Sequence, residues 1–356
     1  MERKILLNPG PVTISERVRK ALLWSNMCHR EKEFSDILQS VRKDLTSLVH
    51  NGDKYDTVLI SGSGTAAMDS VMSSVVHNNT RVLIITNGAY GARFAEIAEK
   101  YSIDFFEYNQ GWGKAIDLKK IGYALESGMF SHVFVVHHET TTGILNPIKE
   151  IGKLADKYGI IYVVDAISSV GGIPISVDEC HIDYLLGTAN KCIQGIPGIS
   201  FVVCKKDEIK DTKNFGRSFY LNLYDEWQYQ NKNLIMRFTS PTYTVFALRV
   251  ALNELRDEGI ENRYDRYRKS YDVLERGLCN DFGFKLFDTP TKSKLLGTFY
   301  IPDEFAFDDF HDRLYDRGFT IYPGKVKNEN TFRVAVMGDL CEKDIKNFLE
   351  AVSEVI

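Results

Sequence analysis

The sequence predicts an α/β protein with a large domain built on a mostly parallel sheet, followed by a smaller α+β domain at the C-terminus. Short apolar runs rich in β-branched residues alternate with helical stretches over the first two thirds of the chain. This alternation is typical of a parallel sheet covered by helices. Beyond Glu258 a long helix is followed by short strands and further helices, which is α+β order. A chain of 356 residues is also long for one hydrophobic core.

Composition and charge fit a globular enzyme of the cytoplasm. The net charge of −4 gives no electrostatic reason to expect nucleic acid or an anionic membrane as a partner. No apolar run approaches the roughly 20 residues of a membrane-spanning helix, and the N-terminal apolar run is too short for a signal peptide. The six cysteines show neither a CxxC pair nor a metal-ligand spacing, so we expect free thiols in a reducing compartment and no metal site.

Apolar runs mark six strands in the large domain. We expect them at Thr57–Ile60, Arg81–Ile85, His132–Val136, Ile160–Val164, Asp183–Leu186 and Ile199–Cys204. Helices are expected at Ser15–Leu23, Asp36–Val49, Ala66–Val76, from the turn after Thr86 to about Lys100, and from Pro147 to Tyr158.

A further helix closes the large domain. Ser240 is the expected N-cap and Pro241 the first helical residue. The glycine after Glu258 predicts a boundary, so we divide the chain into an arm (1–14), a large domain (15–258) and a small domain (259–356). The apolar stripe of this helix is Val245, Leu248, Leu252 and Leu255. In the small domain, helices are expected at Glu261–Leu278, Asp308–Arg317 and Glu342–Val355, and strands at Leu295–Ile301, Thr320–Tyr322 and Phe332–Val336.

The two residues that point most directly to chemistry are Asp165 and Lys191. Asp165 ends one expected strand, and Lys191 follows the next strand, 26 residues further on. The carboxyl ends of parallel strands meet at one edge of the sheet, where open α/β sheets bind ligands. A lysine can condense with the aldehyde of pyridoxal phosphate, while an acid keeps the pyridine nitrogen protonated. The alternative is a solvated acid and lysine, which any α/β protein has.

Other strand ends carry residues that suit the same cofactor. Ser61-Gly-Ser-Gly-Thr65 between a strand and a helix could cradle a phosphate, although a simple turn with Thr65 as N-cap explains it too. Tyr90 could stack on a planar ring, or pack in the core or an interface. Thr140–Thr142 offer hydroxyls toward a ring oxygen. Arg333 could grip a carboxylate or phosphonate, or be solvated.

Longer runs around these residues resemble a known family. The chain resembles the 2-aminoethylphosphonate–pyruvate transaminases, a branch of the class V, fold-type I pyridoxal phosphate aminotransferases, along nearly its whole length and in the same order. The runs are Leu7-Asn-Pro-Gly-Pro11, Asn87-Gly-Ala-Tyr-Gly-Ala-Arg93, Glu139-Thr-Thr-Thr-Gly-Ile-Leu-Asn-Pro147, Asp165-Ala-Ile-Ser-Ser-Val-Gly-Gly-Ile-Pro174, His181-Ile-Asp-Tyr184, Ala189-Asn-Lys-Cys-Ile-Gln-Gly-Ile-Pro-Gly198, Arg237-Phe-Thr-Ser-Pro-Thr242 and Tyr322-Pro-Gly-Lys-Val326. The Asn-Lys-Cys-Ile-Gln-Gly run is specific to this branch.

The resemblance implies a seven-stranded sheet in the large domain, pyridoxal 5′-phosphate as cofactor, and a homodimer with shared active sites. It also implies residue roles. Lys191 would attach to the cofactor, Asp165 would pair with its ring nitrogen, Tyr90 would stack on the ring, Ser63, Gly64 and Thr65 would hold the phosphate, Thr141 would bond near the ring oxygen, Thr239 would reach the phosphate in the other subunit, and Arg333 would bind the substrate anion.

One stretch departs from the family pattern. Cys28-His-Arg-Glu-Lys-Glu-Phe34 resembles instead the His-Arg stretch of phosphoserine aminotransferases, in which case His29 and Arg30 would bind a substrate anion. A solvated approach to a helix is the equal alternative.

We expect transfer of the amino group of 2-aminoethylphosphonate to pyruvate. The alternatives are a transaminase for phosphonoalanine and phosphonopyruvate, or for another small amino acid of the alanine–glyoxylate or phosphoserine type. A desulfurase or lyase, which would need a loop cysteine, and a pyridoxal phosphate sensor, which would need a DNA-binding domain, fit less well.

Overall fold

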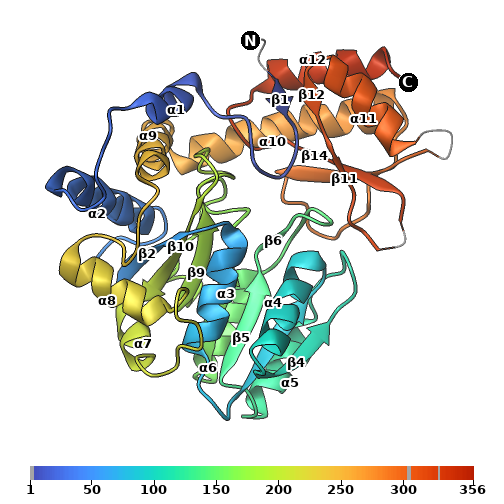
Figure 1. Ribbon diagram of the computed structural model, residues 1–356. Helices are drawn as coiled ribbons and strands as arrows, with labels where there is room; N and C mark the ends of the chain where they lie inside the picture. Colours follow the sequence, from blue (N-terminus) through green and yellow to red (C-terminus); the bar gives the residue numbers. More distant parts are fainter. Residues whose placement is uncertain (1–3, 303–305, 328) are drawn as a thin grey trace.

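The computed structural model describes residues 4–302, 306–327 and 329–356. A large body built on a seven-stranded sheet lies beside a smaller body formed mainly by the C-terminal part of the chain (Figure 1). The first described residues and the C-terminus both lie on the smaller body. The α/β fold class, with a large mostly parallel sheet and a small C-terminal sheet, is therefore confirmed.

The large sheet has the strand order β2-β10-β9-β8-β5-β3-β4. Neighbouring strands run parallel except at β10, which pairs antiparallel with both β2 and β9. All six expected strands are present in this sheet. The strands are β2 (Tyr55–Ser61), β3 (Arg81–Thr86), β4 (Asp104–Asn109), β5 (His132–Val136), β8 (Ile161–Asp165), β9 (Tyr184–Thr188) and β10 (Ile199–Lys205).

The seventh strand, β4, is one that the apolar runs did not mark. It is an edge strand that pairs only with β3, and none of its six residues is fully buried. An edge strand lacks a neighbour on one side and can carry polar residues, so its sequence has no continuous apolar run.

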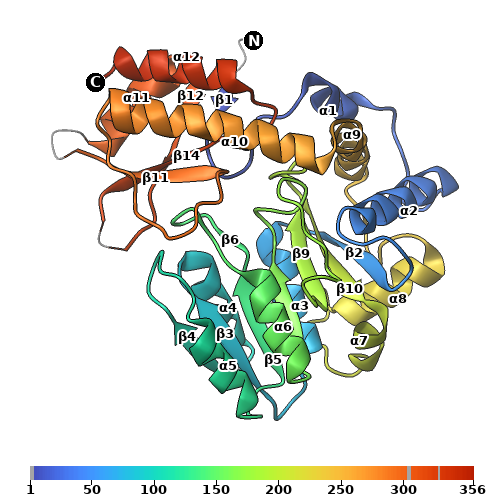
Figure 2. The same cartoon turned by 180° about the vertical axis from the view of Figure 1, so that it is seen from behind.

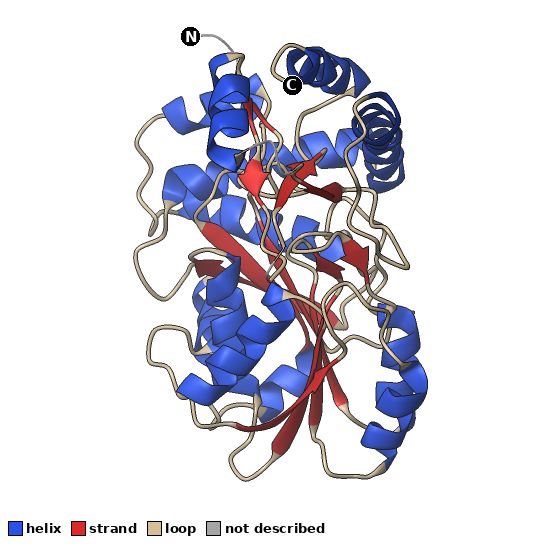
Figure 3. Ribbon diagram, turned by 90° about the vertical axis from the view of Figure 1, so that its right-hand side faces the viewer, coloured by secondary structure: helices blue, strands red, loops and turns tan. Residues whose placement is uncertain are grey.

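Helices cover both faces of the sheet. The face seen in Figure 1 carries α3 and α4, and the face seen in Figure 2 carries α5 and α6. Side chains alternate accordingly: Val82 and Ile84 of β3 belong to the core under α3 and α4, whereas Leu83 and Ile85 belong to the opposite core. Figure 3 shows the sheet between these helices.

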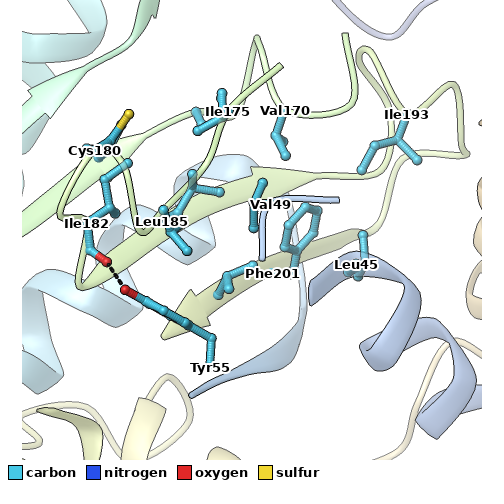
Figure 4. Packing of buried hydrophobic residues seen from close by; sticks show 14 of the residues in the cluster. Leu45, Val49, Tyr55, Val170, Ile175, Cys180, Ile182, Leu185, Ile193 and Phe201 are labelled. Atoms are coloured by element: carbon cyan, nitrogen blue, oxygen red, sulfur yellow. Dashed lines mark hydrogen bonds between the residues drawn. The ribbon is translucent and has the colours of Figure 1, made fainter. Parts of the chain in front are cut away.

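The core opposite α3 and α4 is the larger of the two. It joins the sheet to α2 and α9 as well as to α5 and α6. Figure 4 shows part of it, where the Tyr55 hydroxyl donates to the carbonyl of Ile182 at 2.9 Å. The helices of the large body are α1 (Glu16–Lys20), α2 (Lys32–Ser47), α3 (Gly64–Val75), α4 (Ala89–Lys100), α5 (Leu118–Glu126), α6 (Ile148–Lys157), α7 (Lys206–Asp211), α8 (Leu223–Asn233) and α9 (Thr242–Glu258).

Helix α9 differs from expectation at its start. Its apolar stripe is buried as expected. The expected N-cap, Ser240, is wrong: Pro241 takes the cap position with a non-helical ψ of 79°, and the helix begins at Thr242. The buried Ser240 hydroxyl has no hydrogen-bond partner among the described residues. Gly259, with φ of 81°, separates α9 from the next helix, α10 (Ile260–Arg276).

The small body has a three-stranded antiparallel sheet, ordered β11-β14-β13, against α10, α11 (Phe307–Asp316) and α12 (Glu342–Ser353). Its strands are β11 (Leu296–Tyr300), β13 (Tyr322–Pro323) and β14 (Thr331–Ala335). The single strand expected at Thr320–Tyr322 is wrong. The run divides into β12 (Phe319–Thr320) and β13, which belong to different sheets.

The N-terminal arm contacts the small body. Its strand β1 (Ile5–Leu6) pairs in parallel with β12. Residues 1–3 of the expected arm lie outside the described residues. The boundaries at residues 14 and 258 remain a prediction.

No helix in the described ranges is both long and apolar enough to cross a membrane. Within the same ranges, no three His, Cys, Asp or Glu side chains are grouped so that they could hold a metal ion.

Candidate active site

Asp165 and Lys191 meet at the carboxyl edge of the large sheet. β8 ends at Asp165, which pairs with Leu186 of β9, and Lys191 follows β9 by three residues. The Asp165 side chain is buried, and its Oδ1 accepts a hydrogen bond from the Ile167 N–H at 2.8 Å. The Lys191 Nζ donates to the hydroxyl of Ser168 at 3.0 Å. The expected convergence of acid and lysine is therefore present in the structure.

Burial moves both groups toward their neutral forms. It raises the pKa of Asp165 to about 6, although the bond from the Ile167 N–H and the charge of Lys191 act in the opposite direction. It also lowers the pKa of the Lys191 amine, against the effects of Tyr90 and Asp165. A buried acid of this kind would be stabilised as the anion by a cation brought next to it, such as a protonated pyridine nitrogen.

Tyr90 lies close to Lys191. It belongs to the first turn of α4, and its ring centroid is 5.6 Å from the Lys191 Nζ. Burial would raise the pKa of its hydroxyl, but the positive charges of Lys191, Lys325 and Arg333 together lower it below its usual value. Tyr90 is thus near the lysine, and its expected stacking on a ring held there remains a prediction.

A buried carboxylate that the sequence interpretation missed fixes this tyrosine. Glu139 Oε2 accepts from the backbone N–H groups of Tyr90 at 3.0 Å and Gly91 at 3.2 Å, at the positive end of α4. Glu139 Oε1 accepts from the N–H of Thr141 at 3.0 Å and from its hydroxyl at 2.5 Å. A Cβ on Gly88 would lie 2.3 Å from Glu139 Cγ, so only glycine fits there.

The Thr141 hydroxyl is occupied by contacts within the chain. Its one hydroxyl proton is donated to Glu139, and the hydroxyl oxygen accepts from the Ala89 N–H at 3.1 Å. Thr141 therefore joins the turn at α4 to the loop after β5. Its expected bond near a ring oxygen remains a prediction.

The turn at the start of α3 fits a phosphate group. Ser63 is the N-cap residue, and its exposed hydroxyl makes no capping bond. The first N–H groups of a helix lack partners within the helix and attract anions. A Cβ on Gly64 would lie 2.9 Å from Ile167 Cγ2, so glycine is needed where this turn approaches the segment after Asp165. Thr65 Oγ1 accepts from Arg93 at 3.2 Å.

Arg333 reaches the site from the small body. It lies on β14 and is only 1% exposed, so the alternative of a solvated arginine is wrong. Its Nε donates to the carbonyl of Pro323 at 3.1 Å and its Nη1 to the carbonyl of Thr140 at 3.3 Å. Burial lowers the pKa of its guanidinium, and the nearby Tyr90 acts in the opposite direction. Lys325, which the sequence interpretation also missed as a site residue, has its Nζ 5.7 Å from the Tyr90 ring centroid.

Ser168 connects Lys191 to the small body. Its carbonyl faces the Nδ1 of His138 at 3.2 Å, so that nitrogen must carry the proton, and the Nε2 accepts from the Ser293 hydroxyl at 2.9 Å. The arm closes the other side of the lysine, because a Cβ on Gly10 would lie 3.1 Å from Lys191 Cγ. The site is therefore built from both bodies and the arm.

Three expected site residues lie elsewhere. His29 and the exposed Arg30 are in the turn before α2, and Thr239 is exposed just before α9. In the described part of the chain, none of the polar contacts of Lys191, Asp165, Tyr90 or Arg333 involves them. The two segments are neighbours: the Tyr243 hydroxyl donates to Asn26 at 2.7 Å, and the rings of Trp24 and Phe246 lie 4.6 Å apart. Their roles toward a ligand remain predictions.

Comparison with known proteins identifies the family. The model for class-V aminotransferases matches residues 17–323. The chain is 40% identical to 2-aminoethylphosphonate–pyruvate transaminase of Klebsiella pneumoniae, over 99% of this chain and 97% of that protein. The chain belongs to the class-V aminotransferases. It is also 40% identical to the transaminase of the same name from Bacillus cereus, over 98% of this chain and 97% of that protein. The solved alanine–glyoxylate aminotransferase from Nostoc sp. is 26% identical, with a TM-score of 0.92 over 100% of this chain and 96% of that chain.

Class-V aminotransferases use pyridoxal 5′-phosphate. The site of this aminotransferase fits that group, since it has a lysine, an acid, an aromatic ring and the N-terminal turn of α3 at one edge of the sheet. We assign its binding to Lys191, Asp165, Tyr90, Ser63, Gly64 and Thr65 as a proposal. When bound, the cofactor supplies the aldehyde that takes up an amine and the ring that accepts electrons.

The burial of Asp165 predicts that the cofactor-free aminotransferase loses stability when this carboxyl group ionises. Its folded pKa of about 6 lies above the ordinary 3.8, so the folded chain keeps this proton to higher pH than the unfolded chain. The free energy of unfolding of the cofactor-free aminotransferase should therefore fall as pH rises from about 4 to 6. The cofactor-free Asp165→Asn variant should be more stable at pH 7.5 by up to about 3 kcal/mol, and equally stable near pH 4.

Urea unfolding of cofactor-free wild type and variant at the two pH values measures this difference. Asp207→Asn is a control, because Asp207 is exposed on α7 and pairs with Lys210 at 3.0 Å. An Asp165→Asn variant no more stable than wild type at pH 7.5 would contradict the burial cost.

Proposed function

We propose that this aminotransferase moves the amino group of 2-aminoethylphosphonate to pyruvate, giving phosphonoacetaldehyde and L-alanine. The observation that carries the proposal is that two further cations, Arg333 and Lys325, lie near Tyr90, as Lys191 does. These two cations could bind an anionic group of the substrate while the substrate amine lies near Lys191. The 40% identity over nearly the full length to transaminases of this name supports the same substrate class.

Lys191 would hold the cofactor and would also act as the base. Its Nζ would take the proton from the carbon that bears the substrate nitrogen and would later return it, while the cofactor would accept the electrons of the broken C–H bond. Burial favours the neutral amine, which is the form that can accept a proton. The hydrogen bond to Ser168 holds that amine beside the site between the two transfers.

The two cations differ in what they recognise. Two donors of Arg333 are held by backbone carbonyls, which orients its planar group, and an oriented guanidinium suits a bidentate grip on an oxyanion. Lys325 is exposed and adds a point charge. A phosphonate carries more negative charge than a carboxylate, so the pair favours a phosphonate in one half-reaction while Arg333 alone can hold the carboxylate of pyruvate in the other.

The second candidate is a transaminase for phosphonoalanine, which carries a phosphonate and a carboxylate together. It would need a further cation in the site. Arg30 lies apart from the site of its own chain, beside the segment that bears Thr239. We propose that these two neighbouring segments reach the active site of the other subunit in a homodimer, and only there would Arg30 favour phosphonoalanine.

Substrate preference can be measured in single turnovers, by following the absorbance of the cofactor after mixing with each amino donor. We expect 2-aminoethylphosphonate to react faster than phosphonoalanine or phosphoserine. Arg333→Met should slow both half-reactions by about a hundredfold or more, because it removes two charge-assisted hydrogen bonds. Lys325→Met should slow the aminophosphonate half-reaction by about tenfold and the alanine half-reaction less.

Arg30→Met is the matched control, and it should leave the rate with 2-aminoethylphosphonate within about twofold of wild type. A faster reaction with phosphonoalanine that is lost in Arg30→Met would replace the first proposal by the second.

Shared sites predict complementation between subunits. In a heterodimer of Lys191→Ala and Thr239→Ala chains, one site would contain a native Lys191 and the native Thr239 of the partner subunit. With each chain carrying a different affinity tag, the purified heterodimer should be more active than the mean of the two homodimers. Activity equal to that mean, or a monomer in sedimentation, would rule out shared sites.

A further inference from the structure

The phosphate-binding turn supplies only part of the charge that a phosphate ester requires. Its donors are the first N–H groups of α3 and the hydroxyls of Ser63 and Thr65, all of which are neutral. A phosphate ester carries about 1.5 to 2 negative charges at neutral pH. A helix N-terminus offsets roughly half a charge. A cation is needed for the rest.

Arg93 lies at this turn. It is on α4, one helical turn after Tyr90, and its Nη1 donates to Thr65 Oγ1 at 3.2 Å. Its guanidinium carbon is 4.8 Å from the Tyr90 ring centroid, so the group lies over the ring and is held in place by it. Arg93 thus joins the two elements that the cofactor would contact, the phosphate-binding turn and the stacking ring.

The charge of Arg93 has no carboxylate partner within the described ranges, where Thr65 is its one hydrogen-bond acceptor. Its side chain is partly buried. Its positive charge lowers the pKa of Asp165, yet the two do not form an ion pair at hydrogen-bonding distance. A partly buried guanidinium without an anion is costly, and an anion at the turn would remove that cost.

We propose that Arg93 binds the 5′-phosphate of the cofactor and supplies the cation that the α3 turn lacks. This adds a residue to Ser63, Gly64 and Thr65, and to Thr239 of the partner subunit. With Nη1 on Thr65, the other N–H groups of Arg93 make no hydrogen bond to a described residue and can donate to phosphate oxygens. A lysine in this place could match the charge but not this geometry. The proposal rests on the use of pyridoxal phosphate and is independent of the amino donor.

Comparing two ligands distinguishes a direct contact of Arg93 with the phosphate from an indirect role of Arg93 in positioning Tyr90. Pyridoxal 5′-phosphate has the phosphate group, whereas pyridoxal has the same ring and aldehyde without it. Dissociation constants for both are measured by absorbance on the cofactor-free full-length protein, for wild type, Arg93→Gln, Arg93→Lys and Lys100→Gln. Lys100→Gln is the matched control, because it removes a cation from the exposed end of the same helix.

Arg93→Gln should bind pyridoxal 5′-phosphate about 10- to 100-fold more weakly, while its affinity for pyridoxal should change by less than about twofold. Arg93→Lys should lose less, and Lys100→Gln should match wild type with both ligands. Inorganic phosphate should strengthen pyridoxal binding to wild type, and this effect should be lost in Arg93→Gln.

Two results would overturn the proposal. Unchanged affinity of Arg93→Gln for pyridoxal 5′-phosphate would show that the phosphate does not contact Arg93. Equal losses for both ligands would show that Arg93 acts only by positioning Tyr90. If Arg93→Gln does not fold, as judged by circular dichroism, Arg93→Met also removes the charge and carries the same comparison and the same two contradictory results. A failure of the aminophosphonate proposal would leave all these affinities unaffected.

Discussion

The burial of two carboxylates at one edge of the sheet is the constraint around which this site is arranged. Asp165 and Glu139 are both buried, and the charge of Glu139 raises the pKa of Asp165 further. Glu139 is compensated within the chain, since it accepts from three backbone N–H groups and a hydroxyl. Within the described ranges, Asp165 accepts from one backbone N–H. A cationic ring nitrogen beside Asp165 would give this carboxylate a partner of opposite charge.

The cations around these acids point to ligands of the opposite sign. Lys191, Arg93, Arg333 and Lys325 all lie at or near the Tyr90 ring, and none of them forms an ion pair among the described residues. A phosphate at the α3 turn and an anionic substrate group at Arg333 would balance this excess of positive charge. Charges without partners would destabilise the empty chain, and binding of cofactor and substrate would offset this cost.

The site also depends on contacts between parts that are distant in sequence. Arg333 comes from β14, His138 bonds Ser293 of the small body, and Gly10 of the arm packs on Lys191. Beside the lysine loop, the Gln194 side chain donates to the Tyr267 hydroxyl and to the carbonyl of Gly338, both at 2.7 Å. A shift of the small body would therefore move Arg333 and the contacts that position the lysine loop.

The strands marked by continuous apolar runs, and the residues that follow those strands, could be predicted from the sequence. Asp165 and Lys191 could be placed because each follows a buried strand whose end lies at a known edge of the sheet. β4 was not predicted because an edge strand needs no continuous apolar run. The predicted N-cap, Ser240, was wrong because its neighbour Pro241 takes that position instead.

Glu139, Ser168, Arg93 and Lys325 were not recognised, although all lie in runs that resemble the family. Their roles depend on the partner that each side chain meets across the fold. For Glu139 this partner is the start of α4, and for Arg93 it is Thr65. A single sequence without coordinates does not specify such partners.

The central claim is that Lys191, among the lysines of this site, is the one that holds the cofactor. Borohydride reduction of the purified holoenzyme, followed by proteolysis and mass spectrometry, tests it directly by fixing the cofactor to the lysine that bears it. We expect the label on the peptide that contains Lys191 and no label in Lys191→Ala. A label on another lysine, such as Lys325, whose amine lies at almost the same distance from the Tyr90 ring, would contradict the account.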